Sequence, residues 1–286
     1  MTRLRTEDIK HIPRALKTYD QRLLNMTGNT LKGIACRAVG LSDDEFEKII
    51  KPCKVCVIPL TCGQGIINGF CSTVSSIINY LGFQSSVAQH SDVAGIAEAF
   101  DKKSDIILLA DDPRFVAINV HTQYVSDNIE MTAKGFVAGL DFMAGGLKGK
   151  EILVIGCGQL GRHTAKTLVA MDACVFVCDI NPQRSLNLQK EIMDELKITI
   201  RIDNDWYSTP GKYPHIIDAT PSAEIIDASV ITPETYVAVP GVPCGLSSEA
   251  RHRLSGRYLH DPLQIGVATM VIDACKPRPV RDSHGF

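Results

Sequence analysis

The first half of the chain alternates between short apolar runs and segments whose apolar residues recur at helical spacing. Apolar runs of about four to eight residues are typical of buried strands, and a spacing of about 3.6 residues is typical of amphipathic helices. The pattern predicts three strands and two intervening helices over residues 55–60, 66–81, 86–89, 93–102 and 105–110. Ahead of them, Thr6 is a favourable cap for a helix whose apolar stripe reaches Leu23. Because strands alternate with helices, residues 1–126 are expected to form a parallel α/β substrate domain.

The second half repeats this alternation after a long connecting helix. Ser126 is the expected cap of that helix, which should run from about Asn128 to Gly145 within a connecting segment, 127–148. The predicted strands of the second domain, residues 149–276, cover residues 151–155, 174–178, 198–202, 215–218, 236–239 and 258–260. A closing helix is predicted over residues 262–275, followed by a disordered tail, 277–286.

The composition narrows the class of protein. In 286 residues, 45% are apolar and 22% are charged, which is ordinary for a globular protein. The formal net charge of −2 provides no basic field to hold nucleic acid or an anionic membrane. No apolar run approaches the roughly 18 residues of a spanning helix, and the first residues lack the apolar core of a signal peptide. We therefore expect a cytoplasmic protein that acts on a small molecule, without nucleic-acid or membrane partners.

Ten cysteines are present, and their placement favours free thiols over disulfides. Cys56, Cys174 and Cys178 lie in apolar, strand-like runs, where a thiol behaves as a small hydrophobic side chain. Cys53 and Cys56 form a C-x-x-C pair, but no second pair follows at zinc spacing. Buried thiols are the favoured interpretation, a metal or redox site is the alternative, and no metal cofactor is predicted.

Residues 156–161 form a G-x-G-x-x-G motif that follows an apolar strand and opens a helical pattern. In this context the first glycine permits a tight turn, the second lets a pyrophosphate approach the backbone, and the third lets helix and strand pack closely. The next strand ends at Asp179, 18 residues beyond Gly161, where a carboxylate can accept both ribose hydroxyls. The predicted fold class is α/β, with a C-terminal Rossmann dinucleotide-binding domain preceded by the smaller parallel α/β domain.

The acidic residue also predicts which dinucleotide binds. A carboxylate repels a 2′-phosphate, which favours NAD over NADP, although Arg184 could turn toward such a phosphate. For Asp179 the alternative is a strand-end cap. Loops 218–221 and 240–243 follow later strands and can complete the pocket. The residues assigned to the NAD site are Gly156, Gly158, Gln159, Leu160, Gly161, Asp179, Ile180, Arg184, Thr220, Pro221, Pro240 and Val242.

Acidic residues mark the substrate side, at the ends of the first domain's strands. Pro113 suits the first position of a helix, which makes Asp112 its natural N-cap and leaves Asp111 without such a duty. Two adjacent carboxylates also raise each other's proton affinity, which suits a base. We therefore expect Asp111 to bind a cation or act as a base, and the alternative is a solvated loop carboxylate.

Other polar residues at strand ends leave two interpretations open. Asp261 before Pro262 suits a helix cap as well as a substrate contact, and His90 and His260 are as compatible with hydrogen-bonded filler as with catalysis. The acidic strand ends, without an arginine cluster, favour a cationic substrate over a carboxylic or phosphorylated one. Oxidation of an amine fits this pattern.

Six segments of the chain form a distinctive set: PLTCGQGII (59–67), ADDPRF (110–115), VIGCG (154–158), ATP (219–221), PGVPC (240–244) and DPLQIG (261–266). On these segments the chain resembles the pyrrolysine-forming dehydrogenases of pyrrolysine biosynthesis, from about Thr6 to Ala274. The resemblance implies NAD-dependent oxidation of the terminal amine of 3-methylornithyl-Nε-lysine. Ammonia then leaves, and the resulting aldehyde condenses with the remaining amine to close the pyrroline ring.

The resemblance also implies roles for individual residues. The family's important aspartate at the end of the third strand falls on Asp111, and Leu4 falls on the N-terminal helix that closes over the substrate. Cys62 stands where the family has serine, and Asp261 where it has glutamate. The residues assigned to the substrate are Leu4, Thr61, Cys62, Asn128 and Asp261.

Two other functions remain open. One is another two-domain Rossmann oxidoreductase of the shikimate or methylene-folate type, which calls for a catalytic lysine or an arginine clamp; Lys54 and Lys134 are expected to be surface residues instead. The other is a non-catalytic NAD-sensing regulator. For the assembly, a homodimer is expected, with apolar residues 267–272 as a suitable contact.

Overall fold

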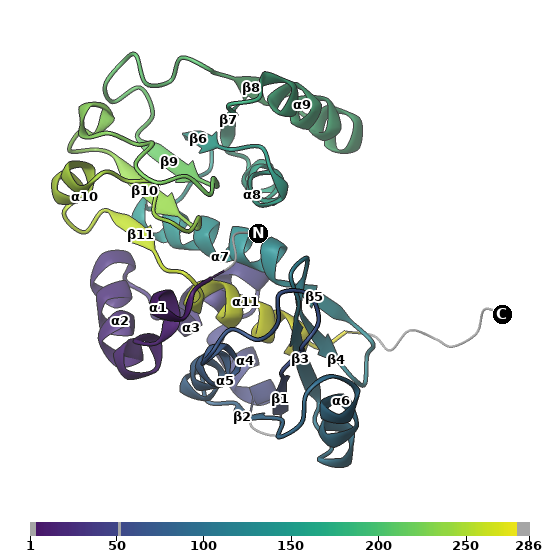
Figure 1. Ribbon diagram of the computed structural model, residues 1–286. Coiled ribbons are helices and arrows are strands. Elements are labelled where there is room, and N and C mark those ends of the chain that lie inside the picture. Colours follow the sequence, from purple (N-terminus) through teal and green to yellow (C-terminus); the bar gives the residue numbers. More distant parts are fainter. Residues whose placement is uncertain (1–3, 51–52, 279–286) are drawn as a thin grey trace.

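The computed structural model describes residues 4–50 and 53–278, which form two α/β lobes (Figure 1). Each lobe has its own sheet, with strand orders β2-β1-β3-β4-β5 and β11-β10-β9-β6-β7-β8. Helix α7 (Asn128–Met143) lies where the lobes meet. It packs on α8 (Gln159–Ala170) of the second lobe and on α3 (Leu31–Val39) and α11 (Gln264–Cys275) of the first. The predicted α/β class is confirmed.

The sheet of the first lobe is parallel on one side and antiparallel on the other. Its parallel strands are β1 (Lys54–Ile58), β2 (Gln84–Val87) and β3 (Ile106–Ala110), and its antiparallel strands are β4 (Phe115–Asn119) and β5 (Val125–Asp127). Alternate residues of β1 face opposite sides: Cys56 packs with Ala99 of α6 (Asp92–Asp101), and Val57 lies in the core that includes Ile77 of α5 (Phe70–Tyr80).

Four N-terminal helices and the last helix cover the α5 side of this sheet. They are α1 (Thr6–Ile9), α2 (Ile12–Thr27), α3 (Leu31–Val39), α4 (Asp43–Ile50) and α11 (Gln264–Cys275). Helix α11 is apolar almost throughout and lies buried in the core, as is expected of a helix that is hydrophobic on all sides.

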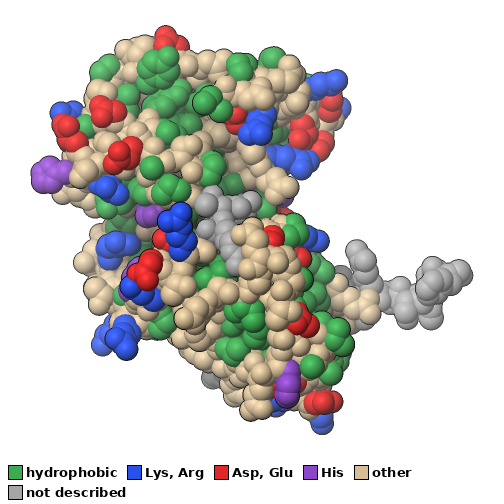
Figure 2. All heavy atoms as spheres, in the orientation of Figure 1, with side chains coloured by type: hydrophobic (Ala, Val, Ile, Leu, Met, Phe, Trp, Pro, Cys, Tyr) green, Lys and Arg blue, Asp and Glu red, His purple; other side chains and the backbone are tan. Residues whose placement is uncertain are grey.

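All strands of the second lobe are parallel. They are β6 (Glu151–Ile155), β7 (Cys174–Cys178), β8 (Arg201–Ile202), β9 (His215–Asp218), β10 (Tyr236–Val239) and β11 (Tyr258–His260). The helices around them are α8 (Gln159–Ala170), α9 (Pro182–Leu196), the short 3-10 helix η1 (Ala228–Val230) and α10 (Ser248–Leu254). Oppositely charged side chains of α8 and α9 pair on the outer surface, where blue and red groups adjoin in Figure 2.

Five strands of the second lobe have the predicted bounds, whereas several local predictions were wrong. The N-terminal helix is broken between Ile9 and Ile12, and α3 and α4 were missed. The antiparallel pair β4–β5 was also missed, so the first lobe is not wholly parallel. The cap of α7 is Asp127, whose Oδ1 accepts a hydrogen bond from the Ile129 amide, and not Ser126.

Burial corrects two further expectations. Residues 267–272 are buried within α11, so they cannot serve as a dimer contact. Cys53 and Cys56 are buried free thiols in different core clusters, as the favoured interpretation predicts, whereas Cys174 is exposed at the start of β7. Of the predicted tail, residues 279–286 lie outside the described residues. Among the described helices, none has the length and hydropathy needed to cross a membrane.

Candidate active site

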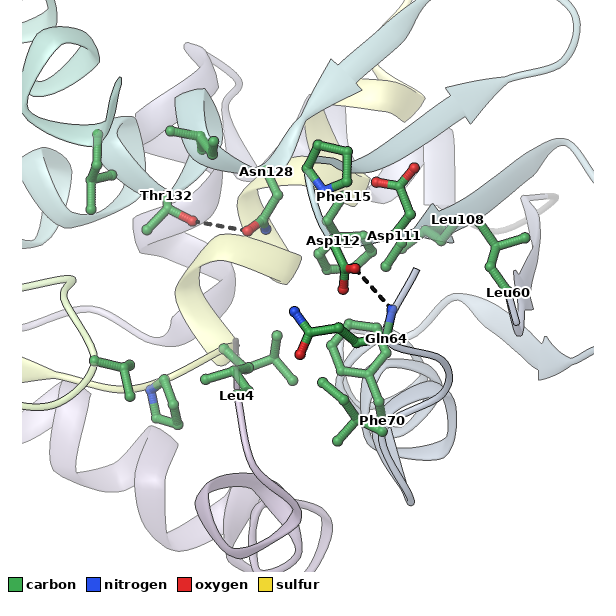
Figure 3. A pocket seen from close by; sticks show the side chains of 18 of the residues that line it. Leu4, Leu60, Gln64, Phe70, Leu108, Asp111, Asp112, Phe115, Asn128 and Thr132 are labelled. Atoms are coloured by element: carbon green, nitrogen blue, oxygen red, sulfur yellow. Dashed lines mark hydrogen bonds between the residues drawn. The ribbon is translucent and has the colours of Figure 1, made fainter. Parts of the chain in front are cut away.

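A cavity of about 670 Å³ lies between the two lobes, and Figure 3 shows part of its lining. Both sheets direct the carboxyl ends of their parallel strands toward it, which is where ligands bind in open α/β folds. The first lobe lines it with residues from 60–67 and 108–115, and the second with residues 158–160, 219–221 and 240–242. The wall is completed by the end of β1, the start of α5, the first turns of α7, and Leu4, Pro262 and Leu263.

The glycine loop of the second lobe has the shape of a dinucleotide cradle. Gly156 has a φ of +93°, in the region that favours glycine. A Cβ on Gly161 would lie 1.8 Å from the Gly156 carbonyl oxygen, so the helix packs on the turn as closely as the motif requires. A Cβ on Gly158 would meet nothing within 4 Å, so the space above the middle glycine is open to a ligand. These residues therefore fit a pyrophosphate.

Asp179 lies beside this loop at the end of β7. Its Oδ2 accepts a hydrogen bond from the Cys157 amide at 2.7 Å, and its Oδ1 accepts one from the Asn181 amide at 2.9 Å. The strand-end cap is therefore present, and each carboxylate oxygen keeps further acceptor capacity for a ribose. Ile180 next to it is fully exposed, and Arg184 is exposed as well. An exposed apolar side chain at this position suits contact with a flat base.

The remaining residues assigned to the cofactor come together at the cavity. Gly158, Gln159 and Leu160 from the start of α8 line it. Loops after β9 and β10 also line it, through Thr220, Pro221, Pro240 and Val242. Gly156, Gly161, Asp179, Ile180 and Arg184 lie around the same loop but outside the cavity lining.

The acidic turn of the first lobe differs from its prediction. Pro113 starts no helix: residues 111–114 form the turn between β3 and β4, so the prediction of Asp112 as a helix N-cap was wrong. Proline suits the early positions of a tight turn as well as those of a helix, which explains the error. Asp112 Oδ2 instead accepts a hydrogen bond from the Gln64 amide at 2.9 Å and holds the loop opposite.

Asp111 lines the cavity and is exposed. Its Oδ1 accepts a hydrogen bond from the Arg114 amide at 2.8 Å, so it also stabilises the turn, contrary to the expectation that it has no such duty. In Figure 3 the Asp112 carboxylate points toward Gln64, and the Asp111 carboxylate lies on the other side of the same turn. Both residues therefore belong to one wall of the cavity, but their carboxylates point in different directions.

Only some of the residues assigned to the substrate line the cavity. Leu4, Cys62 and Asn128 line the cavity. Thr61 is not among its lining residues: its amide and hydroxyl both donate to Asp92, at 2.8 and 2.6 Å, which fixes the start of the loop. Thr61 is thus placed as a structural residue of the loop that carries Cys62.

Asp261 also lies outside the cavity lining, because its carboxyl group is buried. Oδ1 accepts hydrogen bonds from the Leu263 and Ile265 amides, and Oδ2 accepts one from the Tyr19 hydroxyl. Burial raises the pKa of both Tyr19 and Asp261. Asp261 therefore accepts hydrogen bonds from amides at the start of α11, but the helix begins at Gln264 and its N-cap residue is Leu263, so Asp261 is not the N-cap itself. Its assignment to the substrate is corrected, because it lies outside the cavity lining.

The cavity is acidic on its first-lobe wall and otherwise apolar or uncharged. Asp111 and Asp112 are its ionisable carboxylates, and no Lys, Arg or His is found among the described residues that line it. Lys54 is exposed and Lys134 pairs with Glu130, both away from the cavity. His90 is hydrogen-bonded to Glu98, and His260 is hydrogen-bonded to the Val239 carbonyl. Both histidines therefore have the structural role that was the alternative to catalysis.

Several residues that line the cavity were not predicted as site residues from the sequence. Thr132 lies one helical turn after Asn128 and its hydroxyl points to the Asn128 amide oxygen at 3.5 Å (Figure 3). Phe70 and Phe115 pack edge to face with centroids 5.4 Å apart. The spacing of four residues from Asn128 was the available signal for Thr132, whereas the aromatic pair joins segments distant in sequence.

Two family models match successive parts of the chain. Residues 8–126 match the family model "Pyrrolysine biosynthesis protein PylD, N-terminal domain", and residues 130–238 match "Alanine dehydrogenase/PNT, C-terminal domain". The pyrrolysine synthase of Methanosarcina barkeri is 30% identical over 95% of this chain and 97% of its own length. This chain belongs to the pyrrolysine synthase family. The pyrrolysine synthase of Methanosarcina acetivorans is 29% identical over 95% of this chain and 98% of its own.

Solved structures of other proteins share the fold of this chain. A quinate dehydrogenase from Corynebacterium glutamicum, in complex with NAD, aligns with a TM-score of 0.52 at 14% identity over 78% of this chain and 92% of its own. A shikimate dehydrogenase from Aquifex aeolicus aligns with the same TM-score at 17% identity over 80% of this chain and 95% of its own. At these identities the shared property is the two-domain Rossmann dehydrogenase fold.

Proposed function

We propose that this chain oxidises the terminal amine of 3-methylornithyl-Nε-lysine with NAD, releases ammonia and closes the ring of pyrrolysine. The observation that carries the proposal is the charge pattern of the cavity: two aspartates on one wall, a glycine loop on the other, and no cationic side chain among its described residues. Family membership over nearly the whole chain supports the same reaction.

The carboxylates select the charge of the substrate. An ammonium group entering between the lobes is attracted by Asp111 and Asp112, and the apolar remainder of the wall strengthens that attraction by excluding water. A carboxylate or phosphate at the same point would be repelled. This contrast favours an amine over the hydroxy acids or folates of the alternative enzymes.

The glycine loop and Asp179 support NAD as the cofactor. The open space over Gly158 fits a pyrophosphate, and the Asp179 carboxylate would repel the 2′-phosphate of NADP. NAD, when bound, accepts a hydride from the carbon that bears the amine. The residues of the chain supply the cradle, the orientation and the proton transfer.

Asp111 acts as the base in this proposal. An alkyl ammonium has a pKa near about 10.4 and must lose a proton before its nitrogen can assist the departure of hydride. A carboxylate oxygen of Asp111 takes that proton, directly or through one water. The oxidised carbon then carries an iminium group, water converts it to an aldehyde with release of ammonia, and the remaining amine condenses with the aldehyde and returns the water.

The assay of the proposed function combines three readouts. The purified chain is mixed with NAD and 3-methylornithyl-Nε-lysine, and NADH absorbance, ammonia and the mass of the amino-acid product are followed together. We expect all three to appear in equal amounts, and we expect NADP to support much slower turnover. A substrate analogue with a hydroxyl in place of the terminal amine is the matched control and should give no ammonia.

The alternative functions give different results in the same assay. Reduction of NAD with quinate, shikimate or a methylene-folate, but not with the amine, would assign the chain to those dehydrogenases. Binding of NAD without turnover of any substrate would favour the sensing regulator. A homodimer and a cytoplasmic location are also part of the proposal, and light scattering of the purified chain tests the first.

A further inference from the structure

Asp218, the last residue of β9, has a fully buried carboxyl group. Its Oδ1 accepts two hydrogen bonds from Thr220, one from the amide at 3.0 Å and one from the hydroxyl at 2.7 Å. Its Oδ2 has no hydrogen-bond partner among the described residues. A buried carboxyl oxygen without a donor is unfavourable, and neither the fold nor the proposed proton transfer accounts for it.

Close packing fixes Asp218 and Thr220 relative to the cavity. A Cβ on Gly245 would lie 1.7 Å from Asp218 Oδ2, and a Cβ on Gly241 would lie 2.1 Å from the Thr220 carbonyl oxygen. A Cβ on Gly156, in the dinucleotide loop, would lie 2.8 Å from Thr220 Cγ2. Thr220 is therefore held between the glycine loop and the loop after β10, both of which border the cofactor side of the cavity.

These contacts determine what the Thr220 hydroxyl can do. Its single hydrogen is committed to Asp218 Oδ1, and the Ser222 amide donates to its oxygen at 3.3 Å. The hydroxyl can therefore offer only a lone pair to a further ligand. Thr220 lines the cavity, where a ligand group with N–H donors would complement it.

We propose that Asp218 is a positioning residue that fixes the Thr220 hydroxyl as a hydrogen-bond acceptor for the carboxamide of a bound nicotinamide. The inference rests on the proposed function only in taking a nicotinamide dinucleotide as the ligand. Asp218 acts through Thr220 and takes no part in the proton transfer at Asp111.

Protonation of Asp218 should change NAD binding in a pH range that can be measured. Burial raises its pKa from 3.8 to about 6. The titratable groups that face it are the thiols of Cys178 on β7 and Cys244 after β10, and burial raises the pKa of both, so both are neutral near pH 6. Protonated Asp218 is a weaker acceptor and frees the Thr220 hydroxyl to turn.

The test is a calorimetric titration of the substrate-free protein with NAD, at several pH values between 5 and 8. For the unsubstituted protein, we expect the dissociation constant to be constant above about pH 7 and to rise about tenfold toward pH 5. Asp218→Asn keeps the shape but not the charge, so its dissociation constant should be about tenfold higher at pH 8 and nearly independent of pH. Thr220→Val should behave in the same way, and the double substitution should add little.

Asp227→Asn is the matched control. Asp227 Oδ1 accepts the amide of the residue two positions on, Ser229, as Asp218 does with Thr220, but Asp227 lies away from the cavity. The Asp227→Asn variant should bind NAD with the same dissociation constant, and with the same dependence of that constant on pH, as the unsubstituted protein. Thermal melting of each variant shows whether it is folded.

Three outcomes separate this inference from the proposed function. NAD binding with the predicted pH dependence but without amine turnover would refute the proposed function and leave the inference in place. A pH profile that Asp218→Asn does not flatten, or an equal effect of Thr220→Val at every pH with none from Asp218→Asn, would overturn the inference. Failure of the unsubstituted protein to bind NAD would overturn both.

Discussion

The two walls of the cavity are held in place by different means. On the second-lobe wall, glycines allow backbone and side chains to approach closely, as at Gly161, where a Cβ would collide with the Gly156 carbonyl. On the first-lobe wall, carboxylates hold the loops by accepting amide hydrogen bonds, as Asp92 does from Thr61 and Asp112 from Gln64. Close packing at glycines therefore shapes the second-lobe wall, and hydrogen bonds to carboxylates hold the first-lobe wall. We expect substitutions on the two walls to have different effects.

The largest effect is expected at Asp111. Asp111→Asn removes the proposed base while keeping a hydrogen-bond acceptor for the Arg114 amide, so kcat should fall by about 10² or more with NAD affinity unchanged. Steady-state kinetics and calorimetry measure the two quantities.

Two further variants sharpen this result. Asp101→Asn on α6, exposed and outside the cavity, should have no effect on either quantity. Asp112→Asn should raise KM more than it lowers kcat, because Asp112 holds the Gln64 loop. If Asp112→Asn took the larger loss of kcat, the two aspartates would have exchanged roles.

Glycine substitutions on the other wall should affect binding instead. Gly158→Ala places a methyl group in open space, so the melting temperature should hardly change, while NAD affinity should fall by about 10- to 100-fold as pyrophosphate contacts are lost. Gly161→Ala should lower both, because its Cβ would meet backbone. Equal NAD affinity in Gly158→Ala and the unsubstituted protein would contradict the cradle.

A smaller effect is expected where the Asp261 carboxyl is buried. Tyr19→Phe removes the hydroxyl that donates to Asp261 Oδ2 and should lower the free energy of unfolding by about 1–3 kcal/mol. Denaturant unfolding measures this change. Because Asp261 lies outside the cavity, NAD affinity should not change, and KM for the amine should change little. A change in KM for the amine without a loss of stability would indicate that Asp261 contacts the substrate after all.

The smallest effect distinguishes the loops of the two lobes by their response to pH. Glu98 accepts bonds from Lys102 and from the Gln89 and His90 amides, which lowers its pKa to about 2, and bonds from Thr61 lower the pKa of Asp92. A lowered pKa gives stability that is complete above the usual range of the carboxyl and is lost as pH falls through the folded value.

Hydrogen exchange measured as pH falls from about 4.5 toward 2 tests this difference. The Thr61 and Gln89 amides should lose protection first, because their acceptors are carboxylates that become protonated. The Gly156 and Ala219 amides bond to backbone carbonyls, so they should keep it longer. Simultaneous loss at all four amides would contradict this contrast between the loops of the two lobes.

The same contrast explains what the sequence could predict. The glycine loop and the strands before and after it were predictable because the motif, its strand and Asp179 lie within one local βαβ segment. The carboxylates were found by their position at strand ends, but their roles were not. Asp261 and Asp112 bond to partners distant in sequence, Tyr19 and Gln64, which no local pattern reveals.

The apolar sequence of helix α11 was wrongly interpreted as a surface for dimer contact. Apart from Thr269, its residues 267–272 are apolar and all are buried, which is typical of a core helix and not of a dimer contact on a surface. The sequence around Pro113 is ambiguous, because an Asp-Pro pair is compatible with the start of a helix and also with the tight turn that joins β3 to the antiparallel strand β4.

The most direct measurement is a crystal structure of the protein with NADH and an unreactive analogue that keeps the terminal ammonium group. We expect the pyrophosphate over Gly158 and the ammonium nitrogen either about 3 Å from a carboxylate oxygen of Asp111 or joined to it through one water. An ammonium bound away from the acidic turn, or a dinucleotide bound elsewhere than over the glycine loop, would contradict it.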